Sequence, residues 1–183
     1  MKRVILFTLF SLLMSVASFS QVQKNFFGAT LGVSDFNETY MAMYNYFDEK
    51  PYVPIGIISY SNKIYAGYRW GAINVHFHNG KFAQVNFRFN PDLNNATSEQ
   101  IISRYNNLRE ALDLKYKGNA EFKTFDDGSE KGITYYDGRY AVSLNLRYYT
   151  NKKNITQYSE AALWYWDVPL MRQPERPVIN NDL

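Results

Sequence analysis

The chain contains no cysteine and only two histidines, His76 and His78, in 183 residues. Without cysteine it has no disulfide framework, no thiol nucleophile and no residue at which a bacterial lipoprotein is acylated. It also lacks a G-x-S-x-G motif and a glycine-rich phosphate-binding loop. We therefore predict a protein that binds no cofactor and is not a lipoprotein, and these absences favour a non-catalytic protein over an enzyme without deciding between them.

Excess charge of one sign is also missing. Lysine and arginine number 20 against 17 acidic residues, and without residues 1–20 the basic count falls to 18. A net charge near +1 excludes the strongly basic surface that nucleic acid requires. We expect no nucleic-acid partner.

Residues 1–20 have the pattern of a cleaved signal peptide. Lys2 and Arg3 precede an apolar stretch over residues 4–17, and Ser18 and Ser20 are small residues before a cleavage site at Gln21. The stretch is shorter than the roughly 20 residues of a membrane-spanning helix. We predict an exported, soluble protein without a membrane span, and the periplasm and the extracellular space both remain open.

Two segments have the pattern of amphipathic helices. Asp35 with Glu38, and Thr97 with Gln100, each form a capping box at a helix start. Pro51 and Gly118 follow the two segments and favour their ends. The large apolar positions at helical spacing are Phe36, Tyr40, Met43, Tyr44 and Phe47 in the first helix, and Ile101, Tyr105, Leu108 and Leu112 in the second.

Short β-prone segments follow each helix and are separated by turn pairs. Asn79-Gly80 and Asp137-Gly138 predict type I′ hairpins, because both central residues of that turn need a positive φ. Ser61-Asn62 predicts a further turn. A last strand is expected at about residues 157–167, which makes the sheet antiparallel.

The two Gly-centred hairpins also match each other in sequence. Residues 79–83 (NGKFA) align with residues 137–141 (DGRYA), but the following segments align only after a shift of one residue. This slip predicts a β-bulge near Ala83 and Gln84. We predict an α+β fold of two tandem helix-plus-antiparallel-strand repeats, with the helices packed on one face of the sheet. The repeats cover about 26–90 and 91–168 within a single domain over residues 21–168, and residues 169–183 form an extended or disordered tail.

A helix followed by antiparallel strands, given twice over residues 26–167, resembles the β-lactamase-inhibitor-protein group and the outer-membrane assembly lipoproteins of the SmpA type. The segment FGATLGVS at residues 27–34 is similar to the approach to the first helix in small secreted proteins of Gram-negative bacteria. The resemblance implies an exported tandem α+β domain. The chain differs in having one helix per repeat and no cysteine, so no functional residue is carried over.

The two histidines are the residues on which metal or catalytic chemistry would depend. His76 and His78 are two apart on one predicted strand and therefore share a face with Asn74. Two imidazoles can ligate a transition metal or act as a base, but a metal needs a third ligand that no spacing places nearby. A solvated strand face explains the same pattern.

Aromatic residues are abundant, with 16 Tyr, 13 Phe and 3 Trp. Trp164 and Trp166 alternate with large apolar residues on the last strand, so aromatic rings face outward whichever face packs on the helices. Tyr149 and Tyr68 can add to that surface. We predict a non-catalytic binding module of the cell envelope that recognises a protein or peptide through this aromatic sheet face. The alternatives are a glycan-binding protein, a metal-dependent envelope enzyme centred on His76 and His78, or aromatic rings covered by the tail or a second subunit. The sequence leaves the oligomeric state open.

Overall fold

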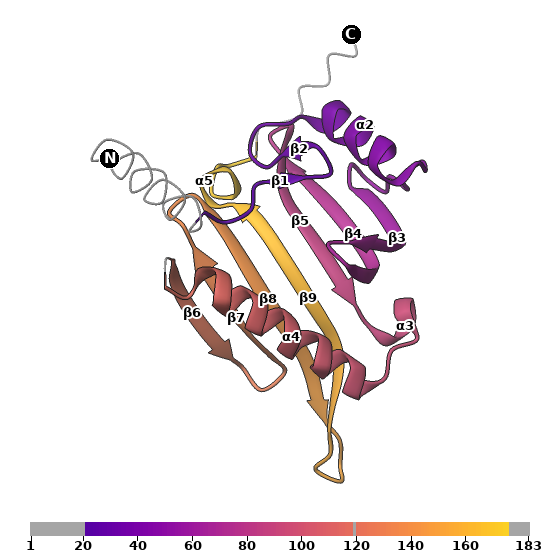
Figure 1. Cartoon of the computed structure of the whole chain (residues 1–183), viewed down its shortest axis with the longest axis vertical. Helices are drawn as coiled ribbons and strands as arrows, with labels where there is room; N and C mark the ends of the chain where they lie inside the picture. The colour runs from indigo at the N-terminus through magenta and orange to yellow at the C-terminus, as the bar shows by residue number, and fades with distance from the viewer. Residues whose placement is uncertain (1–20, 119, 176–183) are drawn as a thin grey trace, which may run out of the picture.

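An antiparallel sheet of seven strands organises the chain, in the order β3-β4-β5-β9-β8-β7-β6 (Figure 1). The structure is a computed structural model that describes residues 21–118 and 120–175, so the predicted signal peptide and the end of the predicted tail lie outside the described residues. The sheet strands are β3 (Ile58–Tyr65), β4 (Tyr68–His78), β5 (Lys81–Phe89), β6 (Glu121–Asp126), β7 (Glu130–Tyr136), β8 (Tyr140–Thr150) and β9 (Thr156–Asp167). A small separate hairpin pairs β1 (Asn25–Phe26) with β2 (Ala29–Thr30), and the helices are α2 (Phe36–Phe47), α3 (Pro91–Asn94), α4 (Ser98–Tyr116) and α5 (Val168–Met171).

The two Gly-centred hairpins form at the predicted positions, but with different turns. Between β4 and β5 both Asn79 and Gly80 have positive φ, 51° and 77°, as a type I′ turn requires. Between β7 and β8 only Gly138 has a positive φ, 93°. There Asp137 Oδ1 accepts hydrogen bonds from the backbone N–H groups of Arg139 and Tyr140, at 3.1 and 2.7 Å.

The turn predicted at Ser61-Asn62 is wrong. β3 runs through both residues, and the chain reverses at Ala66-Gly67, where φ is 51° and 79°. Asn62 does adopt a positive φ of 55°, but it does so inside the strand. Pairing with β4 continues on both sides of Asn62, so register with the neighbouring strand prevails over the turn preference of the Ser-Asn pair.

The β-bulge predicted near Ala83 and Gln84 is confirmed. His76 pairs with Gln84, and the next pair joins Phe77 to Phe82, so Ala83 has no partner on β4. The extra residue restores the alternation of the apolar side chains, since Phe82 and Val85 are both fully buried.

Both predicted capping boxes form. Asp35 Oδ1 accepts from the Glu38 N–H at 2.9 Å, and Thr97 Oγ1 accepts from the Gln100 N–H at 3.3 Å. The predicted apolar face of the second helix is buried, at Ile101, Tyr105, Leu108 and Leu112. No helix within the described residues is both long enough and apolar enough to cross a membrane.

The predicted arrangement as two tandem helix-strand repeats is wrong. About 45% of the described structure is strand and 25% helix, and all seven main strands belong to one sheet. The helices also occupy unequal positions, because α4 lies along β8 and β9 whereas α2 packs on β2 and β5. The similarity between residues 79–83 and 137–141 is therefore that of two hairpins with glycine turns, and does not extend to their surroundings.

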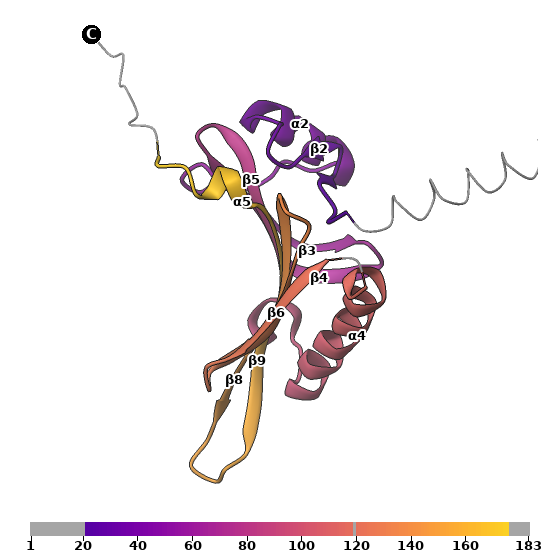
Figure 2. The ribbon, with the colours of Figure 1, turned by 90° about the vertical axis from the view of Figure 1, so that its left-hand side faces the viewer.

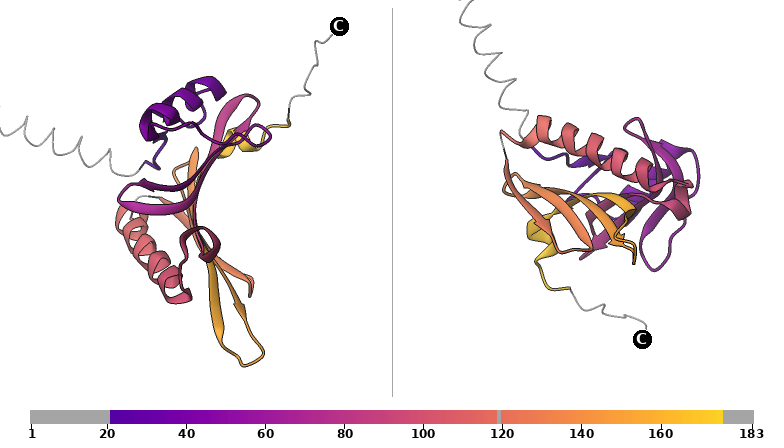
Figure 3. Two further views of the ribbon diagram at one scale, coloured as in Figure 1. Left: turned by 90° about the vertical axis from the view of Figure 1, so that its right-hand side faces the viewer. Right: turned by 90° about the horizontal axis from the view of Figure 1, so that it is seen from below.

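The two faces of the sheet differ in what covers them. Figures 2 and 3 show α4 and α2 on one side, whereas α5 lies on the other side at one end only. The α4 side holds the aromatic core, in which Phe26 and Phe87 are almost fully buried. The opposite side, which we call the outer face, carries Asn74, Asn86, Thr134, Ser143 and Trp164.

The segment predicted as an extended tail begins with a helical turn. Asp167 caps α5 by accepting the Leu170 N–H at 2.9 Å. Beyond the turn, the Gln173 carbonyl lies 2.7 Å from His78 Nε2, which ties this segment to the β4–β5 hairpin on the outer face.

Candidate functional site

The last strand of the sheet divides its large side chains between the two faces. Leu163 and Tyr165 are each 7% exposed and belong to the core on the α4 side. Alternation places Trp164 and Trp166 on the outer face, where both are half-buried. The two tryptophans therefore lie next to each other on the sheet face opposite α4.

A row of side chains crosses the outer face through Trp164, with one residue from each strand in register. The row runs through Ser59, Asn74, Asn86, Trp164, Ser143, Thr134 and Lys123. Most of its members are hydroxyl or amide side chains, which can donate and accept hydrogen bonds. The central tryptophan is thus surrounded by neutral polar groups.

Hydrogen bonds connect the polar members of this row on each side of Trp164. Ser59 Oγ donates to Asn74 Oδ1 at 2.7 Å, and Asn74 Nδ2 donates to Asn86 Oδ1 at 3.0 Å. On the other side Thr134 Oγ1 donates to Ser143 Oγ at 3.0 Å. These bonds restrict the side-chain rotamers, so the surface is ordered before any ligand arrives.

His76 belongs to this network. Its Nε2 lies 3.0 Å from Asn86 Nδ2. Burial lowers the pKa of His76 and so favours the neutral ring, whose Nε2 can accept a hydrogen bond from the amide. His76 therefore has a structural partner already.

The two histidines do not converge on one site. His78 Nε2 contacts the Gln173 carbonyl, whereas His76 contacts Asn86. No group of three or more His, Cys, Asp or Glu side chains in the described part of the chain is arranged to hold a metal ion.

A shallow hollow of about 250 Å³ lies on the outer face between the tryptophans and α5. Trp164 and Trp166 line it together with Met171 of α5. Its polar lining consists of Gln84, Ser143 and Asn145. The hollow thus combines two indole rings with amide and hydroxyl groups.

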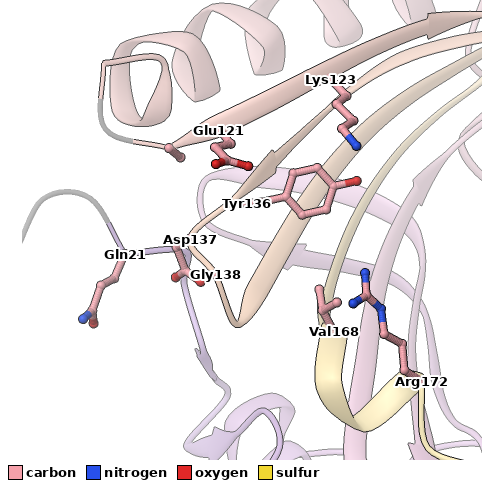
Figure 4. Close-up of a pocket in the computed structure, with 9 residues that line it drawn as sticks. Gln21, Glu121, Lys123, Tyr136, Asp137, Gly138, Val168 and Arg172 are labelled. Carbon is pink, nitrogen blue, oxygen red and sulfur yellow. The ribbon is translucent and has the colours of Figure 1, made fainter.

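A larger groove of about 690 Å³ lies farther along the same face, next to β6 and β7. Figure 4 shows Lys123, Tyr136 and Arg172 directed into its space. Neither Lys123 nor Arg172 forms an ion pair with any residue that the structure describes. Tyr136 and Trp166 flank Ala141 in one cross-strand row, so the groove and the hollow are neighbours.

At the opposite end of the outer face the charges are paired. Glu160, 5% exposed, accepts from Arg88 Nε at 2.7 Å and from Asn90 Nδ2 at 3.1 Å. Arg147 Nη1 reaches the same carboxylate at 3.3 Å. This cluster satisfies a buried carboxylate and leaves no charge free for a ligand.

The other two residues predicted for the aromatic surface lie apart from the tryptophans. Tyr149 is 54% exposed on the arm formed where β8 and β9 extend past their neighbours, and alternation from Arg147 places it on the outer face. Tyr68 is on the α4 side, with its ring centroid 4.6 Å from the Arg104 guanidinium. The structure therefore brings together Trp164 and Trp166 alone of the four.

Sequence reasoning missed the polar row and the groove. Lys123 and Arg172 are 49 positions apart, and no local pattern links them. The alternation of β8 at Ser143 and Asn145 is the signal that could have indicated a polar outer face.

Comparison with protein-family models, curated proteins and solved structures finds no match to this chain. The resemblance to the β-lactamase-inhibitor-protein group stays a prediction. The outer face is therefore the basis for a functional assignment.

Proposed function

We propose that this protein is a non-catalytic binding module that recognises a protein or peptide through its outer face. One observation carries the proposal: Trp164 and Trp166 line one hollow on a sheet face that the helices leave largely uncovered. Tryptophan is enriched among the residues that contribute most to protein interfaces, because it supplies a large contact area at a low entropy cost.

An extended peptide suits this surface. The hollow and the neighbouring groove lie along the row that joins Trp166 to Tyr136. A peptide that crosses the strands can place an apolar side chain on the indoles and an acidic side chain near Lys123 and Arg172. Amides such as Gln84 and Asn145 can bond to the peptide backbone.

The test is a peptide-array screen with the protein from residue 21 onward, followed by titration of the best peptides. Trp164→Ala and Trp166→Ala are expected to weaken binding about 30-fold or more each, as interface hot spots do. Tyr52→Ala is the matched control, because Tyr52 is 73% exposed and lies outside the hollow and the groove. Peptide binding that both tryptophan variants retain would refute the proposal.

Glycan binding is the second candidate. Indole rings stack on the flat faces of sugars, and the amides of Gln84 and Asn145 beside Trp164 and Trp166 suit sugar hydroxyls. A glycan array run on the same protein separates the two candidates. If glycans bind in a tryptophan-dependent way and peptides do not bind, the ligand of the outer face is a sugar and not a peptide.

We also propose that the module acts outside the cytoplasm, in the periplasm or beyond, on a partner of the cell envelope. The support is the basic and then apolar pattern of residues 1–20. Expression of the full chain in a Gram-negative host, with mass spectrometry of the periplasmic fraction, tests this. A mature form that begins at Gln21 is expected, and retention of residues 1–20 would contradict it.

A further inference from the structure

A second, more enclosed cavity lies on the opposite side of the sheet from the tryptophan hollow. It has a volume of about 170 Å³ and opens between α4 and the end of the β3–β4 hairpin. Its lining is mainly apolar and includes Trp70, Phe87, Leu108, Leu112, Leu163 and Tyr165. It forms because α4 lies over β8 and β9 and so leaves a gap beside β4 and β5.

One tyrosine that lines this cavity has a hydroxyl without a partner among the described residues. Tyr165 lines it, and its hydroxyl forms no hydrogen bond with any of the described residues. The Tyr116 hydroxyl is also buried without a partner in the described part of the chain. Burial, together with the nearby hydroxyls of Tyr116 and Tyr65, raises the pKa of Tyr165 far above its ordinary value.

Buried hydroxyls normally have hydrogen-bond partners, because burial without one leaves their lost hydration uncompensated. Tyr65 follows this rule, since its hydroxyl accepts from Gln23 Nε2 at 2.9 Å. Because Tyr165 lines the cavity, its unpartnered hydroxyl is available to a ligand bound there. The lining is mainly apolar, and its other polar groups belong to Gln23, Tyr65, Tyr68 and Lys115.

The volume sets the size of the ligand. A dry apolar cavity of about 150 Å³ is known to admit one benzene ring. We infer that this cavity binds a small uncharged molecule of one aromatic ring bearing one hydroxyl, with the ring among Trp70, Phe87 and Leu108 and the hydroxyl bonded to Tyr165. A cation is disfavoured because Lys115 also lines the cavity, and an anion would lose hydration against a lining that is mainly apolar.

The cavity is independent of the outer face. Its residues point to the α4 side of the sheet, whereas Trp164 and Trp166 point to the other. The inference therefore goes beyond the proposed peptide binding, and either can fail without the other.

The test compares p-cresol with p-xylene, which replaces the hydroxyl by a methyl group of similar size. The protein carries Trp164→Phe and Trp166→Phe, so Trp70 is the remaining tryptophan and its fluorescence reports on the cavity. Titration into the millimolar range is expected to give one site, with p-cresol bound about tenfold more tightly, as one additional hydrogen bond allows.

Two variants locate the site. Tyr165→Phe is expected to remove the preference for p-cresol while p-xylene still binds. Ala111→Leu places a larger side chain at the cavity lining from an exposed position of α4, and is expected to weaken both ligands at least tenfold. Leu114→Ala is the matched control on α4, because Leu114 is 84% exposed and lies outside the cavity.

Three results would overturn the inference. The first is that p-cresol shows no saturable binding. The second is that the protein with Tyr165 binds p-cresol and p-xylene with equal affinity. The third is that Ala111→Leu leaves the affinity for both compounds unchanged. Unfolding of each variant in urea is followed in parallel, so that a loss of binding through a loss of the fold is recognised.

Discussion

Replacing Gly32 by alanine is expected to destabilise the protein by about 3–5 kcal/mol, through two effects that the structure separates. Gly32 has a φ of 77°, where an L-residue costs about 1–2 kcal/mol. An added Cβ would also lie 2.1 Å from Asp167 Oδ2, far inside van der Waals contact. The Asp167 carboxylate must then move.

That carboxylate cannot move without losing its bonds. Asp167 is fully buried, with Oδ2 bound to Arg139 Nε at 2.9 Å and Oδ1 bound to the Leu170 N–H at 2.9 Å. Breaking a buried ion pair costs about 3–5 kcal/mol, and we take a value at or below the lower end of that range because Arg139 is 56% exposed. The displaced carboxylate therefore adds about 2–3 kcal/mol to the backbone effect.

Urea unfolding followed by tryptophan fluorescence measures the difference, and Gly80→Ala is the matched control. Gly80 has the same φ of 77°, but a Cβ added there would have no heavy atom within 4 Å. Gly80→Ala is expected to cost about 1–2 kcal/mol. In an Asp167→Ala background, the loss of unfolding free energy caused by Gly32→Ala should fall to the value of Gly80→Ala as well. Equal losses for Gly32→Ala and Gly80→Ala in the natural background would refute the reasoning.

Two further predictions concern ionisable groups. Glu160→Ala removes the carboxylate that accepts hydrogen bonds from two arginines and from buried Asn90. It should lower the free energy of unfolding in urea by about 2–4 kcal/mol. Glu49→Ala, at an exposed ion pair, should lower it by under about 1 kcal/mol. A loss as small as that of Glu49→Ala would contradict the assigned network. His76 has a lowered folded-state pKa, so the unfolded chain binds its proton more readily. Its contribution to stability is present above the unfolded value of 6.5 and is lost as the pH falls below 6.5 through the lower folded-state pKa. His76→Gln should flatten this pH dependence of the unfolding free energy, and a profile that His76→Gln leaves unchanged would contradict the prediction.

The local elements of the fold could be predicted from sequence because their causes are local. A capping box such as Asp35 with Glu38 needs residues three apart, and the bulge at Ala83 is visible as a change in alternation. The turn at Ala66-Gly67 was missed, because Ser61-Asn62 has the stronger turn composition and only strand pairing overrides it.

The order of the strands could not be predicted in the same way. Similar hairpins suggested two repeats, but pairing of β5 with β9 joins all strands into one sheet, and that contact depends on long-range packing. Of the candidate site, alternation on β9 correctly separated Trp164 and Trp166 from Leu163 and Tyr165. The position of α4 decides which face of the sheet the helices cover. It also places Tyr68 on the face opposite the two tryptophans.

The place of β9 in the sheet has a consequence for how the chain folds. β9 is the last of the seven sheet strands in sequence, yet it is paired on both sides, with β5 and with β8. The β5–β9 contact joins residues such as Val85 and Tyr165, which are 80 positions apart, so it closes a long loop. During synthesis β3, β4 and β5 emerge well before β9, and the sheet cannot close until β9 is available. Closure of the sheet is thereby delayed until β9 has been synthesised.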